Sequence, residues 1–485
     1  MHGTPESRPR PRVLLLAYAC SPDRGSEGGA GWHHVLESAR YFDTWVLMAD
    51  TFYADDVRRY LAGHGEIDGL HFEFLPKTAW QRFLSRMPGG YYLALNLWHR
   101  RALRKARELH RQLRFDLVHQ VKFCGYREPG YLWKLAAPFV WGPVGGTQNY
   151  PWRFLSEAGL LGAVSEGLHT IANGLQLRLS GRVRSAARRA QLLLAANSSI
   201  QRDFARVHGI SAEVILETGA PPVASVPRRR DPARREIRIL WSGEFTPRKC
   251  LPLLLRALPR LPADVPYRVR VLGRGPQGPA WQRLARRLGV AERIEWLGWL
   301  PHQEALDQYR WADLFVFTSL RDTTGTVVLE ALAAGLPVIC LDHQGVHDVV
   351  SEQCGCKIPP TNPRDVAGRL AEAICALARD PGRWEQCSAA AIRRAEEYSW
   401  PRQGERMAEA YRRVLARAEH PPQASGQDDA EGKRGQSPFV RSTLRAVPAN
   451  GDCPPLPGPS GGGAAEGPLA TSCASDAKGG VAECR

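Results

Sequence analysis

Residues 318–340 read TSLRDTTGTVVLEALAAGLPVIC. An apolar run ends at Thr318, a polar loop with one glycine follows, and the pattern predicts a helix that begins near Thr326. In an open parallel sheet, ligands bind at the carboxyl ends of the strands, and the free N–H groups at a helix start attract anions. The stretch therefore predicts a parallel α/β sheet with a diphosphate site at Gly325 and Thr326.

Two acids flank this predicted phosphate site, Asp322 in the loop and Glu330 one turn into the helix. Their spacing lets Asp322 meet the hydroxyls of a sugar while Glu330 reaches a ribose. An acid at a helix start can instead act only as a cap or dipole partner, worth about 0.3 to 1 kcal/mol. A capping role would explain Asp322 alone, but it explains Glu330 and the rest of residues 318–340 much less well.

The same alternation of short apolar runs and amphipathic stretches continues on both sides of the motif. It is typical of parallel strands joined by helical crossovers, so we expect an α/β fold with two Rossmann-like domains. The expected strands are residues 13–18, 44–48, 71–75, 117–121, 139–140 and 192–196 in the first half, and 237–241, 267–272, 294–297, 314–318 and 337–340 in the second.

Composition divides the chain into segments. Residues 221–235, PPVASVPRRRDPARR, predict an exposed interdomain linker between a domain at 1–220 and a domain at 236–400. Residues 401–418 predict a last helix that crosses back to the first domain. Residues 419–485 are rich in Gly, Pro, Ser and Ala, which predicts a disordered tail.

The central motif resembles that of glycosyltransferase family 4, whose members carry Glu-x7-Glu followed by Ala-x-Gly-x-Pro-Val. The matching residues here are Asp322, Glu330, Ala334, Gly335, Pro337 and Val338, with Asp in place of the first Glu. The resemblance extends over residues 12–416. It implies a GT-B fold, in which an acceptor domain (1–220) and a nucleotide-sugar donor domain (236–400) face each other across a cleft.

A second motif, SGEFTPRKCL at residues 242–251, resembles the family's first donor-domain loop, where an Arg and a Lys hold the diphosphate. Lys249 matches the Lys. The Arg position is taken by Glu244, and Arg248 is a possible substitute. The alternative is that Arg248 and Lys249 are a solvated surface pair.

The stretch GRGPQG at residues 273–278 meets the dinucleotide fingerprint formally, with Glu295 downstream. Pro276 stands where the helix of that fingerprint would start, and the preceding strand is not the first of its domain. We therefore interpret Gly273 as part of a turn near the nucleotide and not as the mark of a dehydrogenase.

Loops of the first half complete the set of candidates. Gly28 and Gly29, in ACSPDRGSEGGAGW, are expected close to a ligand or the facing domain, the alternative being a turn with positive φ. His119 ends a strand and resembles the family's histidine near the donor sugar, although a lone histidine is more often structural. Gly145 and Gly146, in WGPVGGTQ, resemble the family's second glycine loop.

The resemblance implies transfer of a sugar from a nucleoside diphosphate to an acceptor hydroxyl with retention, and no metal site or cofactor is expected. The catalytic candidates are Asp322, His119 and Lys249. The donor-binding candidates are Glu330, Gly325, Thr326, Arg248, Gly243 and Gly273. The acceptor-loop candidates are Gly28, Gly29, Gly145 and Gly146.

The chain has 485 residues and a formal charge of +16, with 65 Lys and Arg against 49 Asp and Glu. Such a surface attracts phosphates. Basic and aromatic residues gather at 81–114, which predicts either peripheral contact with an anionic leaflet or a solvated helix face.

The 11 cysteines of the chain lack paired metal spacings, which favours a reduced, cytoplasmic protein. Residues 13–19 predict a buried strand and not a signal peptide.

The expected partners are thus a nucleoside-diphosphate sugar and a saccharide or lipid-linked acceptor, in cell-surface polysaccharide or lipopolysaccharide assembly. Two other classes stay open. One is a catalytically silent GT-B binding protein. The other is a basic protein that binds nucleic acid or a membrane surface, although no nucleic-acid-binding motif is present and no nucleic acid is expected.

Overall fold

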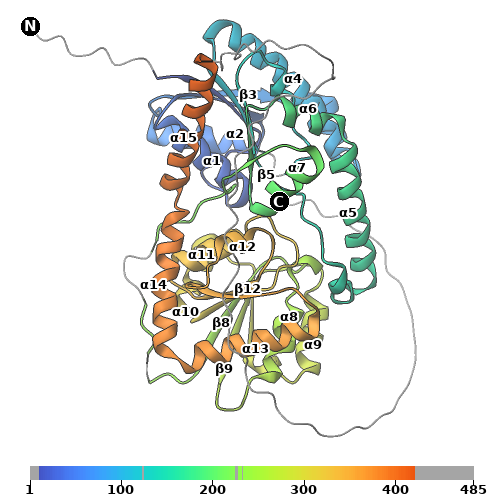
Figure 1. The fold of residues 1–485 in the computed structure, drawn as a ribbon, viewed down its shortest axis with the longest axis vertical. Coiled ribbons are helices and arrows are strands. Elements are labelled where there is room, and N and C mark those ends of the chain that lie inside the picture. Colours follow the sequence, from blue (N-terminus) through green and yellow to red (C-terminus); the bar gives the residue numbers. More distant parts are fainter. Residues whose placement is uncertain (1–9, 123–124, 224–227, 232, 421–485) are drawn as a thin grey trace, which may run out of the picture. The chain divides into compact units, whose positions relative to one another are not determined.

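A computed structural model describes residues 10–122, 125–223, 228–231 and 233–420. These residues form two parallel sheets with helices around each (Figure 1). The first sheet has the order β3-β2-β1-β4-β5-β6-β7 and the second β10-β9-β8-β11-β12-β13. Both predicted Rossmann-like halves are confirmed. The predicted tail lies outside the described residues from 421 onward.

The strands of the first sheet are rich in apolar side chains, because helices cover both faces. β1 and β5 are buried almost throughout. The bounds are β1 Arg12–Ala17, β2 Asp43–Asp50, β3 Leu70–Pro76, β4 Leu117–Lys122, β5 Phe139–Val144, β6 Leu192–Ala195 and β7 Glu213–Val214.

The second sheet has the same character, with β11 and β12 entirely buried. Its bounds are β8 Ile237–Ser242, β9 Tyr267–Leu272, β10 Ile294–Gly298, β11 Leu314–Phe317, β12 Val338–Leu341 and β13 Gly355–Ile358. Each predicted strand of both halves overlaps an observed one. The edge strands β7 and β13 were not predicted.

Helices join the strands of both sheets. In the first half they are α1 Ser26–Ala39, α2 Phe52–His64, α3 Ala79–Arg86, α4 Tyr91–Leu113, α5 Gly159–Leu179, α6 Gly181–Arg189 and α7 Ser198–His208. In the second half they are α8 Pro252–Ala257, α9 Gly278–Arg287, α10 His302–Trp311, α11 Thr326–Ala333, α12 Gln344–Val349, α13 Pro363–Arg379, α14 Pro381–Glu397 and α15 Trp400–Glu419. The predicted helix-rich insertion at 81–114 is the pair α3 and α4.

In each sheet the chain first adds strands on one side of the first strand and then crosses to its other side. This change of side, the switch point, lies between β1 and β4 in one sheet and between β8 and β11 in the other. At such a switch point the two neighbouring loops diverge to opposite faces and leave a crevice at the carboxyl ends of the strands. The loops after β1, β4, β8 and β11 are therefore where this fold places a ligand.

The chain passes between the two halves twice, at residues 219–220 and 398–400. Ala220 and Ser399 form an isolated bridge, and Ala220 N–H donates to the carbonyl of Tyr398 at 2.8 Å. Trp400 then stacks on His33, and α15 continues along α1 (Figure 1). Tyr411 on α15 is buried in the same apolar cluster as β1.

The predicted linker at 221–235 includes arginines that contact the second half. The guanidinium of Arg228 donates to the carbonyls of Tyr309 and Arg310, and Arg234 forms an ion pair with Asp313. Burial lowers the pKa of Arg228. These arginines therefore bind the second half, while no described residue of the linker is fully buried.

Candidate active site

The loops after β8 and β11 are tied to each other by hydrogen bonds. Trp241 Nε1–H donates to Thr318 Oγ1 at 2.9 Å, and that hydroxyl donates to the carbonyl of Lys249 at 2.8 Å. The backbone N–H of Leu320 donates to the carbonyl of Arg248 at 2.7 Å. These bonds fix the two loops at the switch point of the second sheet.

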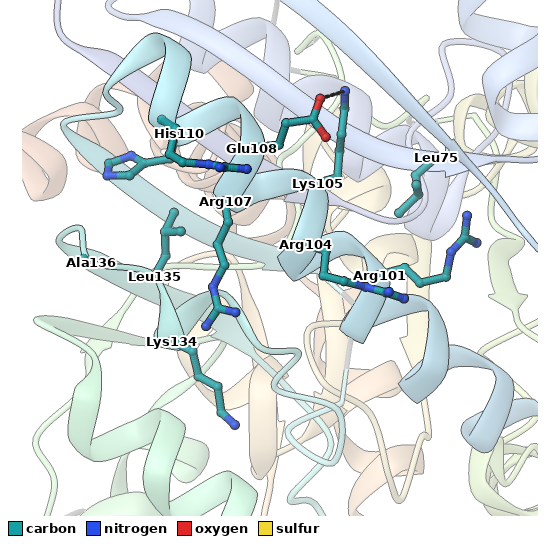
Figure 2. Close-up of a pocket in the computed structure, with 11 residues that line it drawn as sticks. Leu75, Arg101, Arg104, Lys105, Arg107, Glu108, His110, Lys134, Leu135 and Ala136 are labelled. Atoms are coloured by element: carbon teal, nitrogen blue, oxygen red, sulfur yellow. Dashed lines mark hydrogen bonds and ion pairs between the residues drawn. The ribbon is translucent and has the colours of Figure 1, made fainter.

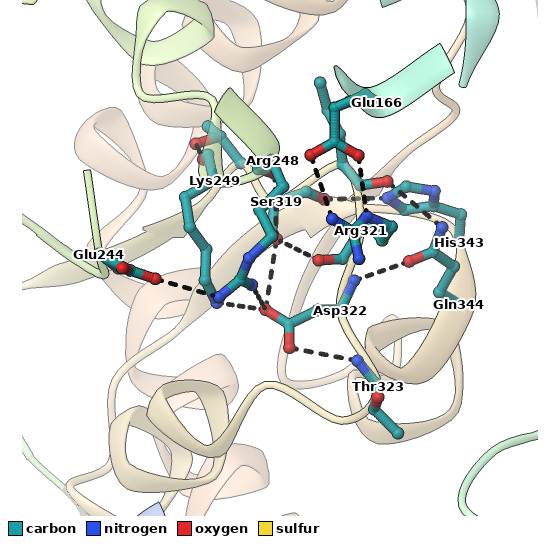
Figure 3. A network of polar contacts seen from close by, with 12 residues as sticks. Glu166, Glu244, Arg248, Lys249, Ser319, Arg321, Asp322, Thr323, His343 and Gln344 are labelled. Carbon is teal, nitrogen blue, oxygen red and sulfur yellow. Dashed lines mark hydrogen bonds and ion pairs between the residues drawn. The ribbon is translucent and has the colours of Figure 1, made fainter. Parts of the chain in front are cut away.

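The result is an ion pair between Lys249 and Asp322, shown in Figure 3. The side chains are 12% and 20% exposed. Arg248 lies 3.9 Å from the same carboxylate oxygen and 3.4 Å from the exposed Glu244. Burial by itself would raise the pKa of Asp322, but Lys249 and Arg248 outweigh it and hold that pKa below its usual value.

Side chains from the start of α12 brace the loop that carries Asp322. Gln344 Oε1 accepts from the backbone N–H of Asp322 at 2.8 Å, and His343 Nε2 lies 3.0 Å from the carbonyl of Ser319 (Figure 3). The loop is thereby fixed from two sides, by the loop after β8 and by α12. Preorganised charges of this kind are what stabilises developing charge in a transition state.

The start of α11 has the predicted form. Gly325 has φ +79°, and a Cβ there would lie 3.2 Å from the ring of Phe317. Thr326, the first residue of the helix, is exposed, so its end of the helix is open to an anion. Glu330, one turn later, accepts a hydrogen bond from Tyr309 Oη at 2.7 Å, and burial raises its pKa.

A cavity of about 330 Å³ joins the two halves at these loops. The residues around it come from the loops and helices near both switch points. They are Glu27, Tyr92, Gly125, Arg127, Glu128, Gly146, Gln148, His169, Arg248, Arg321, Asp322 and Thr323. Of the predicted site residues, Asp322, Arg248 and Gly146 line it. Lys249 pairs with Asp322 and does not itself line the cavity.

Several lining residues were missed in the sequence. The guanidinium of Arg321 makes two 3.1 Å bonds to Glu166 on α5, which links the loop after β11 to the first half. Arg127 donates to Asn173 Oδ1 at 3.0 Å, while its Nε has no partner among the described residues. The sequence offered one signal for these residues, their position next to a predicted motif or strand end. The contact of Arg321 with Glu166 could not be foreseen, because 155 residues separate the two.

The structure corrects the role predicted for His119. Its side chain is fully buried on β4, with Nδ1 2.5 Å from Tyr411 Oη and Nε2 2.7 Å from the carbonyl of Gly142. Burial lowers its pKa to about 3, which keeps the ring neutral. His119 therefore joins β4 to β5 and α15 and does not line the cavity.

Of the four first-half glycines predicted for the site, Gly146 lines the cavity and the other three do not. Gly28 and Gly29 lie within α1, and a Cβ on Gly29 would approach the carbonyl oxygen of Arg24 to 2.4 Å. Neither has positive φ, so the reason for glycine is close contact between helix and loop. Gly145 is buried and accepts from Tyr126 N–H at 3.0 Å, whereas Gly146, with φ +88°, reaches the cavity.

Gly243 and Gly273 bring two backbones together at the ends of β8 and β9. A Cβ on Gly273 would lie 1.9 Å from the carbonyl oxygen of Gly243. Gly275 is held in the same way against the backbone of Phe245. The GRGPQG stretch is thus explained by contact with the neighbouring loop, as a turn beside the site.

No group of three His, Cys, Asp or Glu side chains with metal-binding geometry lies within the described residues. The predicted absence of a metal site stays a prediction. Within the same part of the chain, no helix combines the length and apolar character needed to cross a bilayer.

Comparison with known proteins gives a family match for part of the chain. Residues 236–380 match the family model described as glycosyl transferases group 1. The D-inositol 3-phosphate glycosyltransferase of Thermobispora bispora is 32% identical over 224 residues, which are 44% of this chain and 51% of that protein. The chain thus spans about half the length of the curated relatives it matches.

Two solved structures resemble the fold. Anabaena Alr3699/HepE in complex with UDP and glucose has a TM-score of 0.54 at 17% identity, covering 83% of this chain and 100% of that one. The lipopolysaccharide outer core galactosyltransferase WaaB has a TM-score of 0.57 at 15% identity, covering 83% and 99%. The two parallel sheets and these two structures agree on the GT-B fold, and residues 236–380 match the group 1 glycosyl transferases.

Proposed function

We propose that the protein is a retaining glycosyltransferase that moves a sugar from a nucleoside diphosphate to an acceptor hydroxyl. The observation that supports it best is the pairing of Lys249 with Asp322 beside the open start of α11. In the absence of donor, the carboxylate neutralises the ammonium. A donor diphosphate that approaches Lys249 and Thr326 would take over that neutralisation, which leaves Asp322 free to accept hydrogen bonds from the sugar.

The first half supplies the acceptor side in this proposal. Arg127, Gln148 and His169 line the cavity opposite Asp322, and Gln148 Nε2 has no partner among the described residues. A neutral amide and a guanidinium suit the hydroxyls of a saccharide. The reaction then needs no protein nucleophile, because the departing phosphate oxygen takes the acceptor's proton while Lys249, Arg248 and the helix N-terminus stabilise its charge.

Donor binding and chemistry are tested together by thermal shift and donor hydrolysis with UDP-, GDP- and ADP-sugars. Wild type should be stabilised by one nucleotide series and should release sugar slowly. Glu330→Ala should lose the stabilisation. Asp322→Ala should keep nucleotide binding, because Lys249 is then unpaired, and should lose at least 100-fold in sugar release.

Other outcomes separate the remaining functions. Nucleotide binding without sugar release under any donor would favour a silent GT-B protein, a reading motivated by Glu244 and Asp322 at positions where the family has Arg and Glu. Salt-sensitive DNA retention without nucleotide binding would favour a basic nucleic-acid-binding protein. Either result would contradict the transferase proposal.

We also propose a lipid-linked acceptor and contact with an anionic leaflet on the cytoplasmic side, as in cell-surface polysaccharide or lipopolysaccharide assembly. Exposed apolar side chains lie on α3 and the start of α4, among them Trp80, Phe83 and Tyr92. Tyr92 also lines the site cavity. An apolar tail resting on this surface would therefore bring its head group to the site.

Cationic residues of α4 support the same proposal. Figure 2 shows Arg104, Arg107 and Lys134 around a separate cavity of about 880 Å³. Arg104, Arg107 and Arg111 are exposed, and no carboxylate of the described residues pairs with them. Unpaired cations of this kind attract phosphate head groups, at about 1 kcal/mol each near an anionic surface.

Vesicle co-sedimentation tests this surface. Wild type should pellet with phosphatidylglycerol vesicles, and Arg104→Gln/Arg107→Gln/Arg111→Gln should pellet at least 10-fold less. The matched control is Arg283→Gln/Arg286→Gln/Arg287→Gln, which removes the same charge from exposed positions on α9. Equal pelleting of both variants would contradict a specific membrane surface.

A further inference from the structure

One helix of the first half presents an apolar face to solvent along its whole length. Seven side chains of α5 are between 52% and 86% exposed, namely Leu160, Leu161, Val164, Leu168, Ile171, Leu175 and Leu179. At 100° per residue they fall within a sector about 100° wide, so they form one stripe. Soluble monomers rarely expose so continuous an apolar surface, and such surfaces mark sites of interaction.

The opposite face of α5 is already occupied. Glu166 is buried against Arg321, and Asn173 is buried against Tyr126 and Arg127. α5 is thus held firmly by the rest of the chain, and it lies at the right-hand edge of the ribbon in Figure 1. The stripe is a rigid, preformed surface and needs no rearrangement to bind.

We propose that this stripe pairs with α5 of a second copy of the chain. Val164, Leu168, Ile171 and Leu175 follow one another at intervals of four, three and four residues, the pattern of a seam between two helices. A two-fold axis at the middle of the helix would place the stripe against its own copy.

The size of the stripe agrees with this occupant. Its exposed fractions amount to roughly 800 Å² of apolar surface, which is about what each partner contributes to a stable interface. The helix has 21 residues, so the seam is about 30 Å long.

The charges of α5 favour a protein partner over a lipid surface. Helices that lie on anionic membranes carry Lys and Arg along their polar face. The only charged residues of α5 are Glu166, which is paired with Arg321, and Arg178 near its end. The cations proposed to meet a membrane lie on α4 instead.

Sedimentation equilibrium of the full chain tests the pairing. Wild type should have the mass of two chains at micromolar concentration, and Leu168→Glu/Ile171→Glu should raise the dimer dissociation constant at least 100-fold. Ser165→Glu/Gln176→Glu adds the same charge at exposed positions of α5 outside the stripe and should change that constant less than three-fold. Circular dichroism spectra equal to that of wild type in both variants would show that each is folded.

Three results would overturn the proposal. They are a wild-type monomer at every concentration, equal dissociation of both variants, or a monomer that pellets with neutral phosphatidylcholine vesicles and loses this on Leu168→Glu/Ile171→Glu. The last result would assign the stripe to lipid. None of these measurements depends on sugar transfer, so they stand apart from the proposed activity.

Discussion

The two acids of the central motif have opposite pKa shifts although they lie eight residues apart. Both are largely shielded from solvent, which raises the pKa of a carboxyl group. Asp322 has Lys249 and Arg248 beside it, and their positive charges reverse the effect. Glu330 has the neutral hydroxyl of Tyr309, so the effect of burial prevails. The two carboxylates therefore respond to pH in opposite ways.

Replacing Glu330 by Gln is expected to stabilise the free protein near neutral pH. Because its folded pKa is raised, Glu330 holds its proton more tightly in the folded chain, and its contribution to stability falls as pH rises above the unfolded value. Glu330→Gln keeps an acceptor for Tyr309 and removes the charge. Urea unfolding should give a free energy of unfolding about 1 kcal/mol above wild type at pH 7, with little difference at pH 4.

Asp322→Asn serves as the control of opposite sign. The folded pKa of Asp322 is lowered, so its stabilisation is present above the unfolded pKa and is lost as pH falls through the folded one. This variant should lose about 1 to 3 kcal/mol at pH 7, since Lys249 is left without its carboxylate. A Glu330→Gln variant less stable than wild type at pH 7 would contradict the assignment.

Asp322, Lys249 and Arg248 lie together because their loops follow β8 and β11, which are neighbours at a switch point, whereas Gly146 follows β5 of the first sheet. The sequence predicted these residues for one site, and their roles stay a prediction. It could not show that His119 points into the core, since position at a strand end does not tell which face a side chain takes. Arg321 was missed because its partner Glu166 belongs to a helix of the other half.

At the scale of elements, the packing where the chain passes between the halves requires glycine at position 219. A Cβ on Gly219 would lie 2.7 Å from the indole of Trp400, which is already stacked on His33. Gly219→Ala is therefore expected to displace Trp400 and to cost about 1 to 3 kcal/mol. Thermal unfolding followed by tryptophan fluorescence would measure both effects.

Gly63→Ala is the matched control for that substitution. Gly63 is exposed on α2, and a Cβ there would meet nothing within 4 Å. Alanine in a helix is favoured over glycine by about 0.5 to 1 kcal/mol, so this variant should be slightly more stable than wild type. Equal melting temperatures for the two variants would show that Gly219 is not constrained by Trp400.

Secondary structure was predicted correctly where the pattern of apolar residues reflects burial in the fold. Strands covered on both faces appear as continuous apolar runs, and every predicted one is present. The edge strand β7 has two residues, too few for any pattern to be recognised. No element was predicted for residues 159–179, although the apolar residues of α5 recur at helical spacing.

At the scale of the whole molecule, the first sheet is completed by the last described helix. Met407, Ala408 and Tyr411 of α15 belong to the apolar cluster around β1, and Tyr411 reaches His119 on β4. A chain that ends before Trp400 should therefore unfold non-cooperatively or aggregate. A chain that ends after His420 keeps every described helix and strand and should keep the wild-type melting temperature within about 2 °C.

Differential scanning calorimetry of the two shortened chains distinguishes these outcomes. A cooperative transition of wild-type size in the chain without α15 would show that the first half is an independent unit. A loss of stability in the chain that ends after His420 would show instead that residues 421–485 contribute to the fold.

The return of α15 also bears on how the protein is made. A ribosome releases β1 and β4 long before it releases Tyr411, which follows His119 by 292 residues. Until then the cluster around β1 has no α15 to close it, while the second half can already complete its sheet. The packing around β1 is thus finished long after β1 is synthesised, and the nascent first half has to avoid aggregation throughout translation of the second.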